Sequence, residues 1–346
     1  MAEVTQDVST ETRKVDHIRI NLEENVDFPR LTTGLERYRF MHRALPEIDL
    51  ADVDTSVTLF GKTLSVPLLI SSMTGGAEMA RRINQNLAIA AQKHGIAMGV
   101  GSQRAAIEDE NLAHTFKIRQ HAPDILLFAN VGAVQLNYGY GAEECQRAVD
   151  MIEADALILH FNVLQEAVQP EGDTNFAGLL KQVEAVAKKV NVPIIAKEVG
   201  WGFSERDVQA LANVGISAFD VAGSGGTSWS EVEFYRAQTK KHANVARSFA
   251  DWGIPTADAV LYACAGAPDL PVIASGGLRN GIDVAKCIAL GATLGGLAGP
   301  FLKAADESPE AVDELIDELT AQLRITMLCT GSSSIVDLQK AELIKS

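Results

Sequence analysis

The sequence predicts an α/β fold, a (β/α)8 TIM barrel with an N-terminal extension and long loops after the fourth and sixth strands. Eight short apolar segments alternate with segments of helical period, and glycines and polar residues gather at the carboxyl end of nearly every apolar segment. Strands that alternate with helices form parallel sheets, and eight such units close into a barrel. The alternative is an open doubly wound sheet, which would bring together only the strand ends beside its switch point.

The predicted strands are short and nearly continuously apolar, as expected of strands that are buried on both faces. They are residues 66–71, 95–102, 124–132, 156–162, 192–199, 218–224, 271–277 and 293–299. Pro193 and Pro271 stand at the start of two strands, where a missing backbone N–H is tolerated. Helical patterns follow at residues 81–93, 141–152, 177–190, 205–214, 281–290 and 310–327.

The first 65 residues precede this repeating pattern. Residues 1–12 are polar and lack periodicity, which predicts a segment that is mobile without ligand, and residues 34–44 have a helix-like pattern. We expect residues 1–65 to form an N-terminal arm and barrel-capping extension. Residues 66–346 are expected to form the catalytic barrel as one structural domain.

Two longer segments interrupt the alternation. Residues 163–176 follow the fourth strand and are acidic, with glycine and proline, while residues 227–256 follow the sixth and carry five aromatic residues. Long loops at this end of a barrel commonly serve as lids or subunit contacts. An ordinary insertion is the alternative for residues 227–256.

The composition excludes several classes of protein. The chain has 346 residues and a formal net charge of −15, which argues against a nucleic-acid or anionic-membrane surface. A local group of Arg and Lys can still hold an anionic small molecule. No apolar run approaches the roughly 20 residues needed to cross a bilayer, and the polar N-terminus has no signal-peptide core. The four cysteines lie far apart without a CxxC pair, so we expect reduced thiols and a cytoplasmic location.

Glycines gather at the ends of the last three predicted strands. They lie in residues 223–227, 275–279 and 298–300, and a helical pattern follows the second group. Glycine lets a backbone approach an anion closely, and a helix N-terminus directs free N–H groups toward it. Barrels often bind phosphate in this corner, so we predict a phosphate site there, with Arg279 adding charge.

Other candidate residues have weaker local signals. His160 and Asn162 alternate along the fourth strand and therefore share one face, although a lone histidine on a strand is often a satisfied core residue. Arg13 and Lys14 lie on the polar arm, and composition alone favours a solvated charge pair. Arg104 follows the second strand and has a guanidinium suited to phosphate.

Longer motifs carry a family resemblance. SGGLRNGIDVAKCIALGA (275–292) resembles the strand-seven and helix-seven signature of FMN-binding barrels, including the α-hydroxy-acid oxidases. Further motifs occur in order, nearly from end to end. They are RKVDH (13–17), MTGG (73–76), GSQR (101–104), NVGAVQL (130–136), HFNVLQEAVQPEGDTNF (160–176), KEVGWG (197–202), AGSGGTSW (222–229) and MLCTGSS (327–333). Together they resemble the type 2 isopentenyl diphosphate isomerases, and the QExxQPEGD stretch is the most specific.

The resemblance implies interconversion of isopentenyl and dimethylallyl diphosphate by a 1,3-allylic proton shift, in isoprenoid biosynthesis. It implies FMN that is active in its reduced form, Mg²⁺ on the substrate diphosphate, and NADPH or NADH as reductant. Protonating an alkene is difficult for side-chain acids, which makes a flavin acid/base plausible. The family also suggests a homotetramer or homo-octamer.

The matching motifs imply a role for each site residue. Gln165 is the implied catalytic residue; an amide is a poor acid, so it would position the substrate or relay a proton. Glu166 matches the Mg²⁺ ligand, since Mg²⁺ uses one or two carboxylates with waters and phosphates. The substrate contacts would be Arg13, Lys14, Ser102, Gln103, Arg104, His160, Asn162 and Gln165. Together with the glycine corner, the FMN contacts would be Ser72, Met73, Thr74, Gly75, Ser102, Asn130, Lys197, Ala222, Gly226, Thr227, Gly277, Arg279, Ala298 and Gly299.

Two other functions remain as alternatives. One is an FMN-dependent oxidoreductase of the hydroxy-acid oxidase type. Those enzymes carry a catalytic histidine before the glycines of strand six, where this chain has Ala222, and that departure counts against an oxidase. The other is a non-catalytic barrel that keeps a ligand pocket, against which the intact Gln165 and Glu166 argue.

Overall fold

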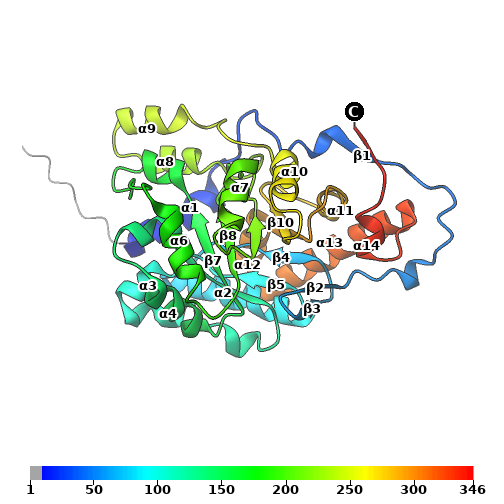
Figure 1. The fold of residues 1–346 in the computed structure, drawn as a ribbon, viewed down its shortest axis with the longest axis horizontal. Coiled ribbons are helices and arrows are strands. Elements are labelled where there is room, and N and C mark those ends of the chain that lie inside the picture. The colour runs from blue at the N-terminus through cyan, green and yellow to red at the C-terminus, as the bar shows by residue number, and fades with distance from the viewer. Residues whose placement is uncertain (1–9, 346) are drawn as a thin grey trace, which may run out of the picture.

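A closed barrel of parallel strands forms the centre of the molecule (Figure 1). The computed structural model describes the backbone of residues 10–345 and the side chains of residues 14–345. Within this range the barrel has eight strands in chain order, and the last pairs with the first. They are β4 (Leu68–Ile70), β5 (Ala97–Gly99), β6 (Leu127–Gly132), β7 (Ala156–Phe161), β8 (Ile194–Glu198), β9 (Ala218–Asp220), β10 (Val272–Ser275) and β11 (Leu294–Leu297). Each lies within a predicted strand, which confirms the barrel and excludes the open sheet.

The barrel interior is a packed core. Leu69, Phe128, Ile158 and other residues at neighbouring registers point inward and form one buried cluster. The hairpin of β2 (Val57–Leu59) and β3 (Lys62–Leu64) adds Leu59 and Leu64 to that cluster, so it closes one end of the barrel. A second, larger cluster lies between the strands and the surrounding helices. The carboxyl ends of the strands, at the opposite end of the barrel, therefore remain available for a ligand site.

Helices surround the barrel, and the predicted ones are present with shifts of a few residues at their ends. Those expected from the sequence are α2 (Glu78–His94), α4 (Ala142–Ile152), α6 (Leu179–Ala187), α7 (Glu205–Ala212), α11 (Gly281–Ala289) and α13 (Pro309–Thr330). Further helices are α3 (Arg104–Glu108), α5 (Val163–Val168), α8 (Trp229–Arg236), α9 (Lys240–Arg247), α10 (Thr256–Gly266), α12 (Gly299–Glu307) and α14 (Ile335–Leu338). Short 3₁₀ helices are η1 (Leu35–Arg37), η2 (Leu50–Asp52), η3 (Glu110–Thr115), η4 (Arg119–His121) and η5 (Ala133–Asn137). None of the described helices is long and apolar enough to cross a membrane.

The N-terminal extension differs most from the prediction. The helix expected at residues 34–44 is wrong: η1 is followed by β1 (Tyr38–Phe40), which pairs with β12 (Leu343–Lys345). The partner strand comes from the far end of the chain, so a local pattern could not show the pairing. No helix was predicted before residue 34, yet residues 10–23 form α1 (Thr10–Glu23). The predicted mobility of residues 1–12 falls largely on residues 1–9, which lie outside the described residues.

The two interrupting segments contain helices that the sequence pattern did not reveal. Residues 163–176 begin with α5, and residues 227–256 contain α8 and α9. Helix α8 packs against α1, α5 and α9, so both segments and the N-terminal helix meet at one end of the barrel (Figure 1). The division at residue 65 into extension and barrel domain stays a prediction.

Candidate active site

A cavity of about 890 Å³ opens at the carboxyl ends of the strands. Residues that follow every one of the eight barrel strands line it, and α1 forms part of its wall. Its volume is in the range of sites that enclose a cofactor or a small-molecule ligand. The barrel topology therefore brings the polar strand ends together, as the sequence predicted.

Most of the predicted site residues line this cavity. They are Lys14, Ser72, Met73, Thr74, Ser102, Arg104, Asn130, His160, Asn162, Gln165, Glu166, Lys197, Ala222, Gly226, Thr227, Gly277, Arg279, Ala298 and Gly299. The side chain of Arg13 lies outside the described residues, so its predicted contact is not placed.

Gln103 and Gly75 do not line the cavity, and their ligand contacts stay predictions. The Gln103 amide is fully buried; it donates to the Ala148 carbonyl (2.8 Å) and accepts from the Asn130 N–H (2.9 Å). It therefore fastens α4 to β6 and faces away from a substrate. A Cβ on Gly75 would lie 1.9 Å from the Phe116 ring, so this glycine allows close packing behind the wall.

The glycines after β9 and β10 pack backbone against backbone. A Cβ on Gly226 would lie 2.6 Å from the Gly277 nitrogen, and one on Gly276 would lie 2.0 Å from the Gly223 oxygen. Gly276 and Gly277 also have φ values of 105° and 78°, which favour glycine. Beside them α12 begins at the cavity wall, and its N-cap residue Ala298 supplies no capping side chain. Uncapped N–H groups beside a glycine cradle fit a phosphate, as predicted for this corner.

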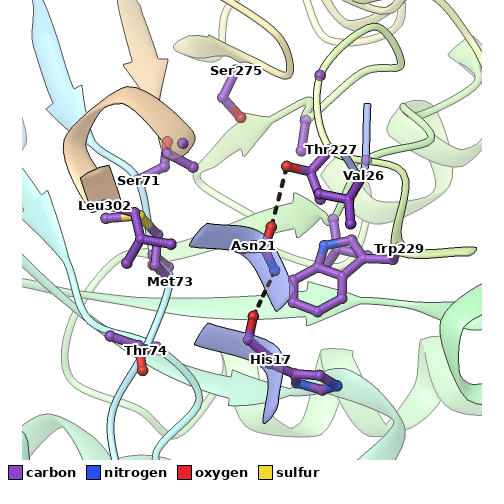
Figure 2. A pocket seen from close by; sticks show the side chains of 18 of the residues that line it. His17, Asn21, Val26, Ser71, Met73, Thr74, Thr227, Trp229, Ser275 and Leu302 are labelled. Carbon is purple, nitrogen blue, oxygen red and sulfur yellow. Dashed lines mark hydrogen bonds between the residues drawn. The ribbon is translucent and has the colours of Figure 1, made fainter. Parts of the chain in front are cut away.

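Buried hydroxyls on the cavity wall have no hydrogen-bond partner in the described protein. They are those of Ser71, Ser72 and Thr74, all on the segment after β4. An unsatisfied buried polar group costs about 1–3 kcal/mol, so such groups indicate a polar ligand. Figure 2 shows Ser71 and Thr74 on one side of the view, with Ser275 and Thr227 at other positions around the pocket. Together with the glycine cradle, these hydroxyls fit the polar groups of FMN.

His160 is held in one orientation and is neutral. Its Nδ1 lies 2.7 Å from Asn130 Oδ1, and the Asn130 amide nitrogen donates to the Val100 carbonyl, so Nδ1 must carry the proton. Burial, together with the positive charges of Lys197 and Lys14, lowers the pKa of His160 to about 3. The free Nε2 is then an acceptor.

Glu166 and its neighbours form the polar face of α5. One Glu166 oxygen accepts from the Asn162 amide (2.7 Å) and the other from the Asp173 N–H (2.6 Å). A Cβ on Gly172 would lie 1.9 Å from the Glu166 carbonyl oxygen, so only glycine lets this loop fold over Glu166. The buried Oδ1 of Asn162 has no partner among the described residues.

This donor set fits Mg²⁺ bound with a phosphate ligand. Residues 10–345 include no group of three or more His, Cys, Asp or Glu side chains that would hold a metal by themselves. One carboxylate and nearby amide oxygens leave the remaining positions of a Mg²⁺ ion to water and substrate oxygens.

Charged residues after β5 and β7 are paired around the cavity mouth. Arg104 donates to Asp173 (2.7 Å) and Glu108 (2.8 Å), and Lys14 donates to the Ser102 carbonyl (2.9 Å). Lys14 thereby ties α1 to the segment after β5. If a diphosphate binds beside Lys14 and Arg104, contacts to its oxygens would replace some of these hydrogen bonds.

The sequence reasoning missed the residues that join α1 to α8. The His17 ring packs edge-to-face on Trp229 with centroids 5.1 Å apart, and its Nε2 lies 3.2 Å from Glu233 Oε1. Asn21 accepts from the Thr227 hydroxyl at 3.5 Å, and Figure 2 shows both α1 side chains turned toward Thr227 and Trp229. The spacing of His17 and Asn21 by four residues was the available signal, because it places both on one helix face.

Glu233 is the centre of this junction. Its buried carboxylate accepts from Gln169 (2.8 Å) and Arg236 (2.5 Å) as well as facing His17. Arg236 in turn binds Glu171 (2.8 Å). The loop after α5 is therefore held to α8, and α8 to α1.

Comparison with known proteins gives relatives of similar sequence and similar fold. The family model described as FMN-dependent dehydrogenase matches residues 8–121 and 151–345. The chain is 57% identical to an isopentenyl-diphosphate delta-isomerase of Nostoc sp. (strain PCC 7120 / SAG 25.82 / UTEX 2576), covering 95% of this chain and 94% of that protein. It is 53% identical to the protein of the same name from Rickettsia bellii (strain RML369-C), over 96% of each.

Solved structures of a mandelate oxidase are similar in fold. One, a variant with a monooxide FMN adduct, has a TM-score of 0.66 and 19% identity, covering 98% of this chain and 93% of that chain. Another, with benzoyl-formic acid, has a TM-score of 0.65 at 19% identity, covering 98% and 91%. At this identity the likeness shows the fold alone.

Proposed function

The chain belongs to the isopentenyl-diphosphate delta-isomerases within the FMN-dependent dehydrogenase family, and we propose that it interconverts isopentenyl and dimethylallyl diphosphate with reduced FMN and Mg²⁺. One observation carries the proposal. A single cavity joins the glycine corner, the Lys197 ammonium and the face of α5 that presents Gln165 and Glu166. A cofactor site and an anion-and-metal site therefore share one space.

The residues on the α5 side hold the diphosphate and the metal. Glu166, kept in place by Asn162 and the Asp173 N–H, is the Mg²⁺ ligand. Lys14, Arg104 and His160 bind the diphosphate oxygens. Arg13, next to Lys14, is proposed to join them.

The face of α5 would hold the alkene for the proton shift inside the cavity. Reduced flavin, when bound, supplies acid/base chemistry that side-chain acids are too weak to perform on an alkene. Gln165 positions the hydrocarbon or relays a proton, since an amide is a poor acid. Helix α1 and Trp229 cover the cavity and exclude water from the reacting carbons.

An oxidoreductase of the hydroxy-acid oxidase type is the second candidate, because the solved structures of similar fold are oxidases. Ala222 occupies the place of the histidine that those enzymes use, and its side chain cannot accept a proton. NADPH or NADH as reductant, a homotetramer or homo-octamer, and a cytoplasmic location stay predictions.

One experiment separates the two functions. The holoenzyme is reduced once under anaerobic conditions, free reductant is removed, and isopentenyl diphosphate is added with Mg²⁺. We expect many turnovers to dimethylallyl diphosphate per flavin, with the flavin still reduced at the end. Product limited to one equivalent, with reoxidised flavin, would reject the isomerase. FMN binding without any product would favour a non-catalytic barrel.

A further inference from the structure

A buried charge pair lies behind the cavity wall at the ends of three neighbouring strands. Lys197 on β8 is in register with Asp220 on β9, and Ser275 ends β10 beside them. Lys197 and Ser275 line the cavity, whereas Asp220 does not. The parallel strand order therefore places an enclosed carboxylate directly behind two groups that face the ligand space.

Asp220 is fully enclosed and incompletely hydrogen-bonded. Its exposed fraction is 0%, and its Oδ1 accepts from the Ser275 hydroxyl at 2.5 Å. Its Oδ2 has no hydrogen bond among the described residues but lies 3.8 Å from the Lys197 ammonium. A buried carboxylate is costly unless an opposite charge compensates for it, and the nearby Lys197 supplies that charge.

Among the described residues, Lys197 is the one cation that lies close to the Asp220 carboxylate. Within the described chain, the Lys197 ammonium makes a single hydrogen bond, to the Glu198 carbonyl at 2.7 Å. The Glu198 carboxylate turns instead to the backbone N–H groups of residues 199–201. Burial raises the pKa of Asp220, and the Lys197 charge and the Ser275 hydrogen bond oppose that rise.

We propose that Asp220 is a positioning residue that holds the Lys197 ammonium at the cavity wall and partly offsets its charge, and that it thereby sets the reduction potential of the bound flavin. Because the Ser275 hydroxyl donates its hydrogen to Asp220, its oxygen can only accept a hydrogen bond from a ligand in the cavity. The inference rests on the flavin site of the proposed function, but none of its tests requires isomerase turnover.

The first test measures the midpoint potential of FMN in purified holoenzyme carrying Asp220→Asn. The reduced flavin is anionic, so removing a negative charge that offsets Lys197 should favour reduction. We expect the ratio of reduced to oxidised flavin at a fixed potential to rise about tenfold, which is about 30 mV for a two-electron couple. Asp155→Asn is the matched control, because Asp155 forms ion pairs with Lys62 and Arg119 at the opposite end of the barrel. It should leave the potential unchanged.

The same substitution in a Lys197→Met background shows whether Asp220 acts through the lysine. We expect the Asp220→Asn shift to fall to less than half of its size in the wild-type background. An unchanged potential in Asp220→Asn, or an equal shift in both backgrounds, would overturn the proposal. If the variants show the expected shifts in potential but the wild-type holoenzyme does not isomerise the substrate, the proposed function is rejected and this inference stands.

A stability measurement covers the case in which Asp220→Asn alone does not fold. Lys197→Met leaves Asp220 buried without its counter-charge, so it should lower the melting temperature of the apoprotein. Adding Asp220→Asn to Lys197→Met should recover part of that loss, since the carboxylate no longer needs compensation. Equal melting temperatures for the single and double variants would overturn the charge pairing.

Discussion

His160 lies near the end of β7, on the α5 side of the cavity. Burial lowers its pKa to about 3 from the ordinary value near 6.5, and two cations on the same wall act in the same direction. Its Nδ1–H is engaged by Asn130, so only Nε2 remains for a ligand. Nε2 carries no proton in the ligand-free protein. A hydrogen bond from Nε2 to a phosphate oxygen therefore requires that His160 be protonated when the ligand binds.

The depressed pKa of His160 predicts a pH-dependent stability. Between about pH 6.5 and 3 the unfolded chain binds a proton at this histidine and the folded chain does not. Its contribution is therefore fully present above pH 6.5 and is lost as the pH falls toward 3, by up to about 1.4 kcal/mol per pH unit. We expect His160→Gln to flatten the decline in unfolding free energy between pH 6.5 and 4.5, measured by urea denaturation. His94→Gln, on the outer surface beside Asp313, is the control. Parallel curves for His160→Gln and wild type would contradict the shift.

Glu166 gives a second prediction at the scale of one residue. Glu166→Gln keeps the shape of the side chain and one of its two acceptor oxygens, but it removes the charge that attracts Mg²⁺. We expect the Mg²⁺ concentration for half-maximal activity to rise at least about tenfold and kcat to fall, while FMN stays bound. Glu171→Gln is the matched control, because Glu171 lies on the same loop and pairs with Arg236. An unchanged Mg²⁺ dependence in Glu166→Gln would remove it from the ligand role.

At the scale of elements, α1 is held by polar contacts as well as by the burial of Ile18 and Ile20. The Glu233 carboxylate on α8 meets His17 from α1 and Gln169 from the loop after α5. Lys14 makes a separate contact with the segment after β5. The helix that covers the cavity is thus tied to the same loop that positions Glu166.

Weakening this junction should loosen α1 without emptying the flavin site. In Glu233→Gln the side chain loses its negative charge and one of its two acceptor oxygens, and hydrogen bonds to charged groups contribute about 1.5–3 kcal/mol each. We expect faster hydrogen exchange in residues 14–23 and a rise of about tenfold in the KM for isopentenyl diphosphate, with FMN affinity unchanged. Glu231→Gln is the control, since Glu231 is also buried on α8 but faces Arg247 of α9. Equal exchange rates in the two variants would show that Glu233 does not hold α1.

For the whole molecule, the cofactor corner brings together the ends of three strands, β9, β10 and β11, on the cavity side. The glycine segments after β9 and β10 meet backbone to backbone, and α12 begins beside them. A ligand that occupies this corner stabilises the folded barrel by mass action.

Removal of FMN should therefore lower the melting temperature of the protein. At an FMN concentration one hundred times Kd, binding stabilises by about 2.7 kcal/mol, which a thermal scan detects easily. Riboflavin is the control ligand, because it lacks the phosphate that the glycine corner fits. We expect riboflavin to restore much less of the melting temperature than FMN does. Equal stabilisation by both would place the phosphate outside this corner.

The strands and the meeting of the glycine segments at their ends could be predicted from the sequence because the signals are local. Each barrel strand is a short apolar run, and the glycines that a close backbone approach requires follow directly after the strands. Gln165 and Glu166 lie within one short segment whose residues are neighbours in the chain and in the fold. For these segments, local periodicity and local chemistry were sufficient for the prediction.

Only the tertiary structure decided which distant residues meet and which side chains turn inward. The pairing of β1 with β12, the docking of α1 on α8, and the enclosure of Asp220 behind Lys197 depend on contacts between remote parts of the chain. Gln103 lies beside predicted ligand residues in the sequence, yet packing against α4 turns its amide away from the cavity. Burial and long-range pairing depend on the closed barrel as a whole, so they cannot be predicted from any short segment of the sequence.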